Sequence, residues 1–137
     1  MLLRILHVEA SDDIRFIVDV VLAQFNNLTL LQCASASEAV EKATAFEPQM
    51  LLLDGKHADE CGDAHRAQLQ QQVACKDLPV VYLTSRLEPR IIEKMYSEGV
   101  LGIIPKPFDP LLLPDQLEDL WRQYCRSVTP VLGTSRQ

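Results

Sequence analysis

Cysteine motifs and long apolar runs are missing from this sequence. It contains no C-x-x-C pair and no cysteine with histidine companions at the spacing of zinc ligands. No apolar run is long enough for a transmembrane helix, and the N-terminal segment turns acidic too early for a signal peptide. We therefore expect a cytoplasmic protein with reduced thiols. The widely spaced cysteines are Cys33, Cys61, Cys75 and Cys125.

Positive charge is also scarce. The chain has 13 lysines and arginines against 19 aspartates and glutamates, a net charge of −6. Domains that bind nucleic acid usually carry a basic patch, so we expect no nucleic-acid partner and no anionic membrane surface. The length of 137 residues suits one domain that can bury a continuous core. The composition is that of an ordinary soluble globular protein.

Short apolar runs alternate with longer, more polar stretches along the chain. Runs of four to eight apolar residues between turn signals are typical of buried strands. Because these runs are apolar throughout, they favour a parallel sheet that is covered on both faces. The expected strands are residues 2–8, 28–33, 50–53, 78–83 and 100–104.

Apolar residues at helical spacing fill the intervals between these runs. Ser11 or Asp12 offers an N-cap for the first helix, which we expect to reach Phe25. Ser35 and Ser85 each precede a glutamate by three residues, the spacing of a capping box. The expected helices are residues 12–25, 36–46, 63–72 and 86–98, and a last helix whose regular part starts at Pro114.

Five strands alternating with five helices predict an α/β fold. Right-handed crossovers between parallel strands give a doubly wound five-stranded sheet. In such folds the functional site lies beyond the carboxyl ends of the strands. We expect this domain to cover residues 1–127, followed by a flexible C-terminal tail at 128–137.

The predicted strand ends carry a coherent set of polar side chains. Glu9 follows the first strand, Asp54 ends the third, Thr84 follows the fourth and Lys106 comes just after the fifth. A carboxylate can attack phosphorus as a nucleophile, and a divalent cation can bridge it to the phosphoryl oxygens. A lysine and a hydroxyl can hold the remaining oxygens. The set therefore predicts a phosphoryl-transfer site.

Four stretches that contain these residues resemble the receiver domain of bacterial two-component response regulators. The resemblance covers about residues 3–127 and implies the flavodoxin-like (βα)5 sandwich of that family. Each stretch alone is a weak signal, but their order, spacing and position on the strands agree. They are Arg4-Ile-Leu-His-Val-Glu9, Leu51-Leu-Leu-Asp54 with Gly62 eight residues later, Pro79-Val-Val-Tyr-Leu-Thr84, and Gly99 through Lys106-Pro-Phe-Asp109.

The resemblance implies a role for each matched residue. Asp54 is the position phosphorylated by a histidine kinase or phosphotransfer protein in a phosphorelay. Thr84 matches the hydroxyl that contacts the phosphoryl group and moves on activation. Lys106 matches the lysine that pairs with the phosphoaspartate, and its peptide bond to Pro107 is usually cis in the family. No residue is assigned a catalytic role of its own, so we do not expect an enzyme.

The resemblance also implies a Mg²⁺ site formed by Glu9, Asp54 and the backbone carbonyl of Lys56. The family normally has a second acid directly after the first, and here that position is Ala10. Alanine cannot ligate, and Mg²⁺ demands an octahedral set of oxygen ligands. We therefore expect a weakened magnesium site. Asp12 and Asp13 could in principle approach it, but helix capping is the simpler interpretation.

Two further positions depart from the family pattern. Ile103 stands where the family often has an aromatic residue that changes rotamer on activation. Tyr96 could substitute for it, although membership of an ordinary helix face is the simpler interpretation. His57, in the loop after Asp54, is interpreted as a plain loop histidine. Trp121 and Tyr124 mark either core packing or the face of a homodimer or partner complex.

Two functions from different classes follow. In the first, phosphorylation of Asp54 shifts the population of two states and changes partner binding at the face of the fourth helix, fifth strand and fifth helix. In the alternative, loss of the acid at Ala10 leaves a degenerate pseudo-receiver, a phosphorylation-independent protein-interaction domain. A flavin-binding enzyme is disfavoured because the acidic loop at residues 9–13 would repel phosphate.

Overall fold

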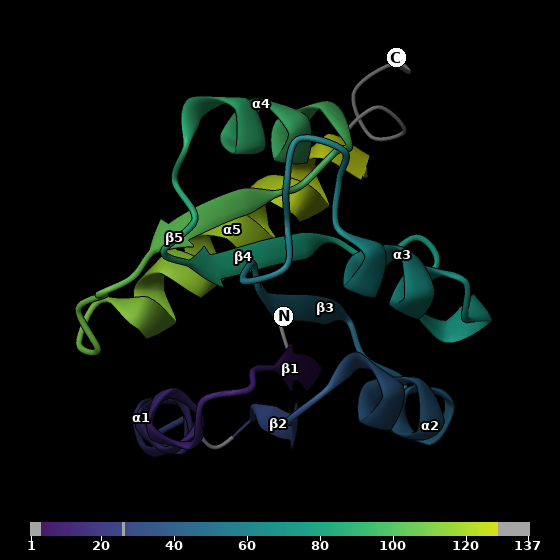
Figure 1. Ribbon diagram of the computed structural model, residues 1–137. Helices are drawn as coiled ribbons and strands as arrows, with labels where there is room; N and C mark the ends of the chain where they lie inside the picture. Colours follow the sequence, from purple (N-terminus) through teal and green to yellow (C-terminus); the bar gives the residue numbers. More distant parts are fainter. Residues whose placement is uncertain (1–3, 26, 129–137) are drawn as a thin grey trace, which may run out of the picture.

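Five parallel strands form one sheet in the order β2-β1-β3-β4-β5. The computed structural model describes residues 4–25 and 27–128 (Figure 1). The α/β fold with a five-stranded parallel sheet is confirmed, and no helix among the described residues is long and apolar enough to cross a membrane. The strands are β1 (Arg4–Val8), β2 (Thr29–Cys33), β3 (Met50–Asp54), β4 (Val80–Thr84) and β5 (Gly102–Pro105).

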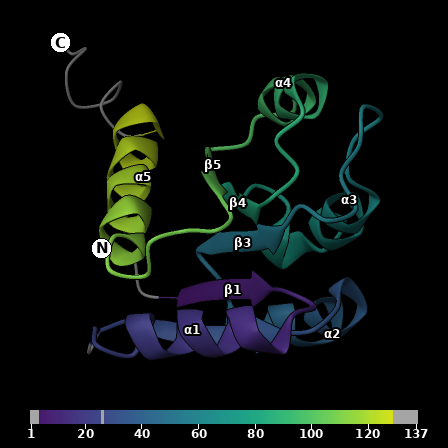
Figure 2. The same ribbon diagram turned by 60° about the vertical axis from the view of Figure 1, so that its left-hand side comes forward.

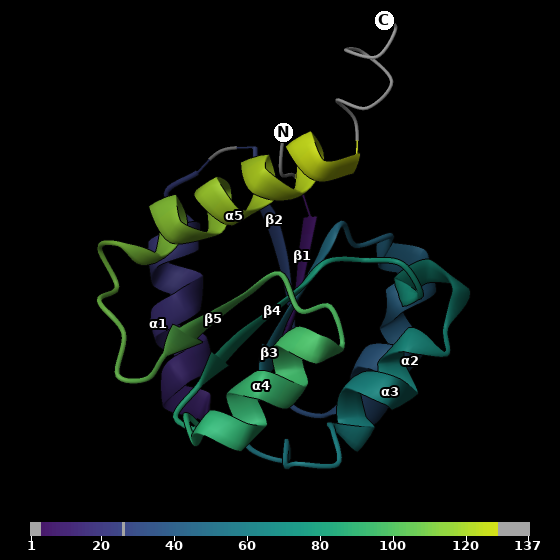
Figure 3. The ribbon, with the colours of Figure 1, turned by 90° about the horizontal axis from the view of Figure 1, so that it is seen from above.

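Helices cover both faces of the sheet (Figures 2 and 3). Helices α1 and α5 pack on one face, and α2, α3 and α4 pack on the other. Side chains along β1 alternate between the two faces of the sheet. Ile5 packs in the core under α1 and α5, and Leu6 packs in the core under α2, α3 and α4. The helices are α1 (Asp12–Leu22), α2 (Ala36–Phe46), α3 (Ala64–Gln70), α4 (Pro89–Ser97) and α5 (Leu113–Val128), with a short 3-10 turn, η1 (Val73–Cys75), after α3.

Two predicted helix starts are confirmed by their caps. The Ser11 hydroxyl accepts the Ile14 N–H at 3.3 Å, and the Ser35 hydroxyl accepts the Glu38 N–H at 3.2 Å. Each hydroxyl satisfies a backbone donor that has no partner within its helix. Helix α1 nevertheless ends at Leu22, short of the predicted Phe25.

The predicted capping box at Ser85 and Glu88 is wrong. Helix α4 begins at Pro89, with Glu88 as its N-cap residue and no side-chain cap bond. The Glu88 carboxylate instead accepts from Arg86 Nε at 3.1 Å. Proline fits the first helical turn because it lacks the N–H that would be unpaired there. Ser85 is therefore an exposed loop residue.

Strands β4 and β5 each begin two residues later than predicted. Pro79 has no N–H to give to a ladder, and β4 starts at the next residue. Val100 lies in the turn after α4, where its N–H donates to the Met95 carbonyl at 3.2 Å instead of to the sheet. Gly99 ends α4 with a φ of 88°, as expected of a C-terminal glycine. Of the predicted tail, only Val128 is described, and it is the last residue of α5.

Candidate functional site

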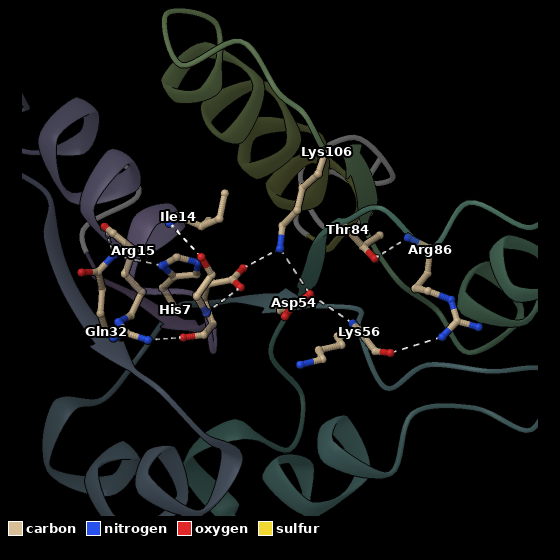
Figure 4. Close-up of polar contacts among 11 residues, drawn as sticks. His7, Ile14, Arg15, Gln32, Asp54, Lys56, Thr84, Arg86 and Lys106 are labelled. Carbon is tan, nitrogen blue, oxygen red and sulfur yellow. Dashed lines mark hydrogen bonds and ion pairs between the residues drawn. The ribbon is translucent and has the colours of Figure 1, made fainter.

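Three side chains from different strand ends meet at one edge of the sheet (Figure 4). The Lys106 Nζ atom lies 2.8 Å from Glu9 Oε1 and 3.3 Å from Asp54 Oδ1. The side chain of Glu9 is 1% exposed, whereas those of Asp54 and Lys106 are 14% and 16% exposed. One ammonium group therefore offsets two carboxylates, one fully buried and one at the rim. The peptide bond from Lys106 to Pro107 is cis, as the resemblance implied.

Glu9 is a buried carboxylate whose pKa depends on its neighbours. Burial raises its pKa above the ordinary value, the hydrogen bond from Lys106 lowers it, and the charge of Asp54 raises it further, with a net upward shift. Its second oxygen, Oε2, accepts the Ser11 N–H at 3.2 Å. Both oxygens are thus held by donors from the protein itself.

Asp54 is oriented but accessible. Its Oδ1 atom accepts the Lys56 N–H at 3.1 Å in addition to the ammonium group of Lys106. No hydrogen bond to Asp54 Oδ2 occurs within residues 4–25 and 27–128. A fixed, partly exposed carboxylate beside an ammonium group is suited to nucleophilic attack on an anionic phosphorus centre.

Thr84 lies at the end of β4, next to this site, and is fully buried. Its Oγ1 atom accepts the Arg86 N–H at 2.9 Å. In the described part of the chain, no hydrogen bond joins this hydroxyl to Asp54 or Lys106. A Cβ atom on Gly55 would lie 2.7 Å from Thr84 Oγ1, so only glycine fits between the acceptor and the hydroxyl.

Replacing Gly55 with alanine should destabilise the domain by about 2 kcal/mol, because the new methyl group overlaps the buried Thr84 side chain. Urea unfolding followed by circular dichroism measures the change. Cys61→Ala, which alters an exposed side chain in the same loop, is the control and should unfold like the wild type. An unchanged midpoint for Gly55→Ala would contradict the tight packing described.

The oxygens expected to bind Mg²⁺ each contact a positively charged side chain of the protein. Glu9 and Asp54 both face the ammonium group of Lys106, and the Lys56 carbonyl accepts from Arg86 Nη1 at 3.2 Å. Ala10 supplies only a methyl group. Among the described residues, no group of three or more histidine, cysteine, aspartate or glutamate side chains could hold a metal ion. The ligand assignment stays a prediction.

A cavity of about 140 Å³ opens beside Asp54. Ala10 and Ala34 form part of its wall, and His57 lines it. The ring of His57 lies 4.2 Å from the ring of His65, on the following helix. Ala10, at the position where the family has an acid, therefore contributes a small apolar side chain to the wall of this cavity.

Two residues near the site were not predicted from the sequence. His7 on β1 is fully buried, with Nδ1 3.1 Å from Gln32 Nε2, and its Nε2 has no partner in the described structure. Burial, with the charges of Lys106 and Arg15, lowers its pKa to about 3. The only sign of its burial in the sequence was its place in an apolar run.

Arg86 is the second residue near the site that was not predicted, and no sequence motif identifies it.

The aromatic candidates take different places. Tyr96 is 53% exposed on α4, so the buried face of that helix is carried by Ile91 and Met95. Trp121 is partly buried and packs against the core between α1, α5 and the sheet, which supports the core-packing interpretation. Its ring stacks on that of Tyr124, with centroids 5.5 Å apart.

Comparison with known proteins gives concordant matches. Residues 5–118 match the family model described as the response regulator receiver domain. The phosphate regulon transcriptional regulatory protein PhoB of Escherichia coli K12 is 30% identical over 120 residues, which are 88% of this chain and 52% of PhoB. The chain therefore spans about half the length of the curated relatives that it matches.

Solved structures agree with this match. The chemotaxis protein CheY4 of Vibrio cholerae has a TM-score of 0.74 at 23% identity, over 88% of this chain and 99% of that one. The N-terminal domain of a response regulator/sensory box/GGDEF 3-domain protein from Carboxydothermus hydrogenoformans has a TM-score of 0.71 at 27% identity, over 91% and 98% of the two chains. The first likeness concerns the fold alone.

Proposed function

The chain belongs to the response regulator receiver family, and on this basis we propose that it is a phosphoacceptor switch in two-component signalling. Receiver domains are signalling domains. A histidine kinase or phosphotransfer protein in the cytoplasm would donate the phosphoryl group to Asp54. The observation that carries this proposal is the contact of Lys106 Nζ with the partly exposed Asp54 carboxylate at 3.3 Å.

The proposed transfer uses the side chains at the sheet edge. A carboxylate oxygen of Asp54 attacks phosphorus while the P–N bond of the donor phosphohistidine breaks. The donor imidazole leaves with the electron pair and takes up a proton. Lys106 offsets the negative charge gained at Asp54. Thr84 follows Leu83, the β4 residue paired with Asp54, so its hydroxyl would hold a phosphoryl oxygen after reorientation.

Switching would follow from the present partner of Thr84. Its hydroxyl accepts the Arg86 N–H, so a turn toward a phosphoryl group would release the loop that leads into α4. We propose that this shifts the population of states at the α4, β5 and α5 face. Tyr96, Ile103 and Leu120 line a groove on that face, which could receive a downstream protein or a second copy of the chain.

The test is incubation with a small acyl phosphate over a range of Mg²⁺ concentrations, followed by intact mass spectrometry. The wild type should gain one phosphoryl group, and Asp54→Asn should gain none, because the amide is not a nucleophile. Asp59→Asn, a matched change in the loop that follows, should be labelled like the wild type. Equal labelling of Asp54→Asn and the wild type would overturn the assignment.

A phosphorylation-independent pseudo-receiver is the second candidate. The observation that favours it is Ala10, which stands at the wall of the cavity beside Asp54 in place of a metal-binding acid. In the same labelling experiment, an unlabelled wild type and a labelled Ala10→Asp variant would favour this candidate. That result would also locate the defect at position 10.

A further inference from the structure

Arg86 forms hydrogen bonds with two residues of the candidate site, Thr84 and Lys56. Its backbone N–H donates to Thr84 Oγ1 at 2.9 Å, and its Nη1 donates to the Lys56 carbonyl at 3.2 Å (Figure 4). The first contact lies at the end of β4 and the second in the loop after β3. Arg86 therefore bridges the switch hydroxyl and the one backbone oxygen that the family resemblance assigns to the metal.

The guanidinium group of Arg86 is held in place by an acid. Nε lies 3.1 Å and Nη2 3.0 Å from Glu88 Oε2, so two of its nitrogens share one carboxylate oxygen. This pairing lowers the pKa of the Glu88 carboxyl. The arginine side chain is 38% exposed, and its rotation would break two hydrogen bonds and the ion pair with Glu88. The remaining nitrogen, Nη1, points at the Lys56 carbonyl.

A guanidinium on that carbonyl competes with a divalent cation in two ways. It takes up one of the two lone pairs of that oxygen, and it places a positive charge close to any cation that would bind there. Mg²⁺ tolerates little departure from octahedral geometry, so it cannot shift far to avoid the charge. Arginine keeps its charge at every accessible pH, which makes the competition permanent.

We infer that Arg86 is a specificity-determining residue that weakens the binding of divalent cations at the acceptor site, independently of the missing acid at Ala10. The two features act on different ligands, because Ala10 removes a carboxylate and Arg86 donates a hydrogen bond to a carbonyl. The inference relies on the proposed function only to locate the site. It predicts that restoring the acid alone recovers part of the metal affinity and that removal of Arg86 recovers the rest.

The experiment is a Mn²⁺ titration of the unphosphorylated protein, followed by electron paramagnetic resonance of the free ion. Ala10→Asp provides the background in which binding is measured. Adding Arg86→Ala to this background should tighten Mn²⁺ binding about tenfold, within the range by which neighbours of metal ligands change affinity. Arg86→Lys, which keeps the charge but loses the fork to Glu88, should give an intermediate affinity.

Arg90→Ala is the matched control, because Arg90 is an exposed arginine on α4 that pairs with Glu60 and not with Lys56. In the Ala10→Asp background it should leave the affinity unchanged. Equal affinities for the Arg86→Ala and Arg90→Ala combinations would overturn the inference, as would failure of every variant to bind Mn²⁺. Failure of Asp54 labelling would instead overturn the proposed function and leave the Mn²⁺ comparison unaffected.

Discussion

Replacing Lys106 with methionine is expected to lower the free energy of unfolding by about 3 kcal/mol at pH 8. The ammonium group is the shared partner of Glu9 and Asp54, and Glu9 is 1% exposed. Removing it leaves a buried carboxylate beside a second one with no cation between them. Loss of one partner of a buried ion pair typically costs this much, because the remaining charge is neither paired nor hydrated.

The destabilisation of Lys106→Met should depend on pH, and this dependence identifies Glu9 as its cause. The folded-state pKa of Glu9 is already raised above its ordinary value, and loss of Lys106 raises it further. A lower pH therefore protonates Glu9 in the folded variant and removes much of the penalty, so the deficit at pH 5 should be smaller than at pH 8. Urea unfolding at both pH values measures it. Lys42→Met, which removes an exposed lysine paired with Glu38, is the control. An equal deficit at both pH values would contradict the prediction.

Acid should destabilise the wild type through His7, by about 4 kcal/mol between pH 7 and pH 3. The folded-state pKa of His7 is about 3, far below the ordinary value of 6.5. Below pH 6.5 the unfolded chain therefore takes up a proton that the folded chain does not. The stability that neutral His7 contributes is complete above pH 6.5 and is lost as the pH falls toward 3.

A His7→Leu variant should lose this acid sensitivity while staying close to wild-type stability at pH 7.5. Gln32 Nε2 keeps a partner, because it also donates to the Arg15 carbonyl at 2.8 Å. Glu9 acts in the opposite direction, since its raised pKa stabilises the fold as the pH falls, but it is present in both proteins and cancels in their difference. Unfolding at a series of pH values measures the slopes. His57→Leu, at an exposed loop position, should keep the wild-type slope, and a His7→Leu slope equal to it would refute the role of His7.

The sheet and its functional edge could be predicted because they depend on patterns that local sequence carries. Apolar runs located all five strands, and parallel pairing necessarily brings the ends at Glu9, Asp54 and Lys106 to one edge. The start of α4 could not be predicted in the same way. Ser85 and Pro89 both offer plausible beginnings, and the choice depends on which partner the Glu88 carboxylate finds in the folded molecule.

The contributions of His7 and Arg86 could not be predicted for a different reason. His7 lies in β1, but its burial and its low pKa depend on residues far away in the sequence, among them Gln32 on β2 and Lys106. Arg86 has a long side chain whose direction is set by contacts with residues 30 positions away and two positions away, at Lys56 and Glu88. Side-chain direction of this kind is a property of tertiary structure, and residue spacing does not encode it.

The bridge from Lys106 to Glu9 joins residues 97 positions apart, and this separation bears on how the chain is made. On the ribosome, Glu9 and Asp54 are synthesised first and can come together while the lysine that pairs with them has not yet emerged. A nascent chain that ends before β5 therefore has four of the five strands, and the two acids at the end of its sheet lack the ammonium group of Lys106. Lys106, directly after β5, supplies the charge that Glu9 and Asp54 need, so we expect this edge of the sheet to become stable only after translation has passed Lys106.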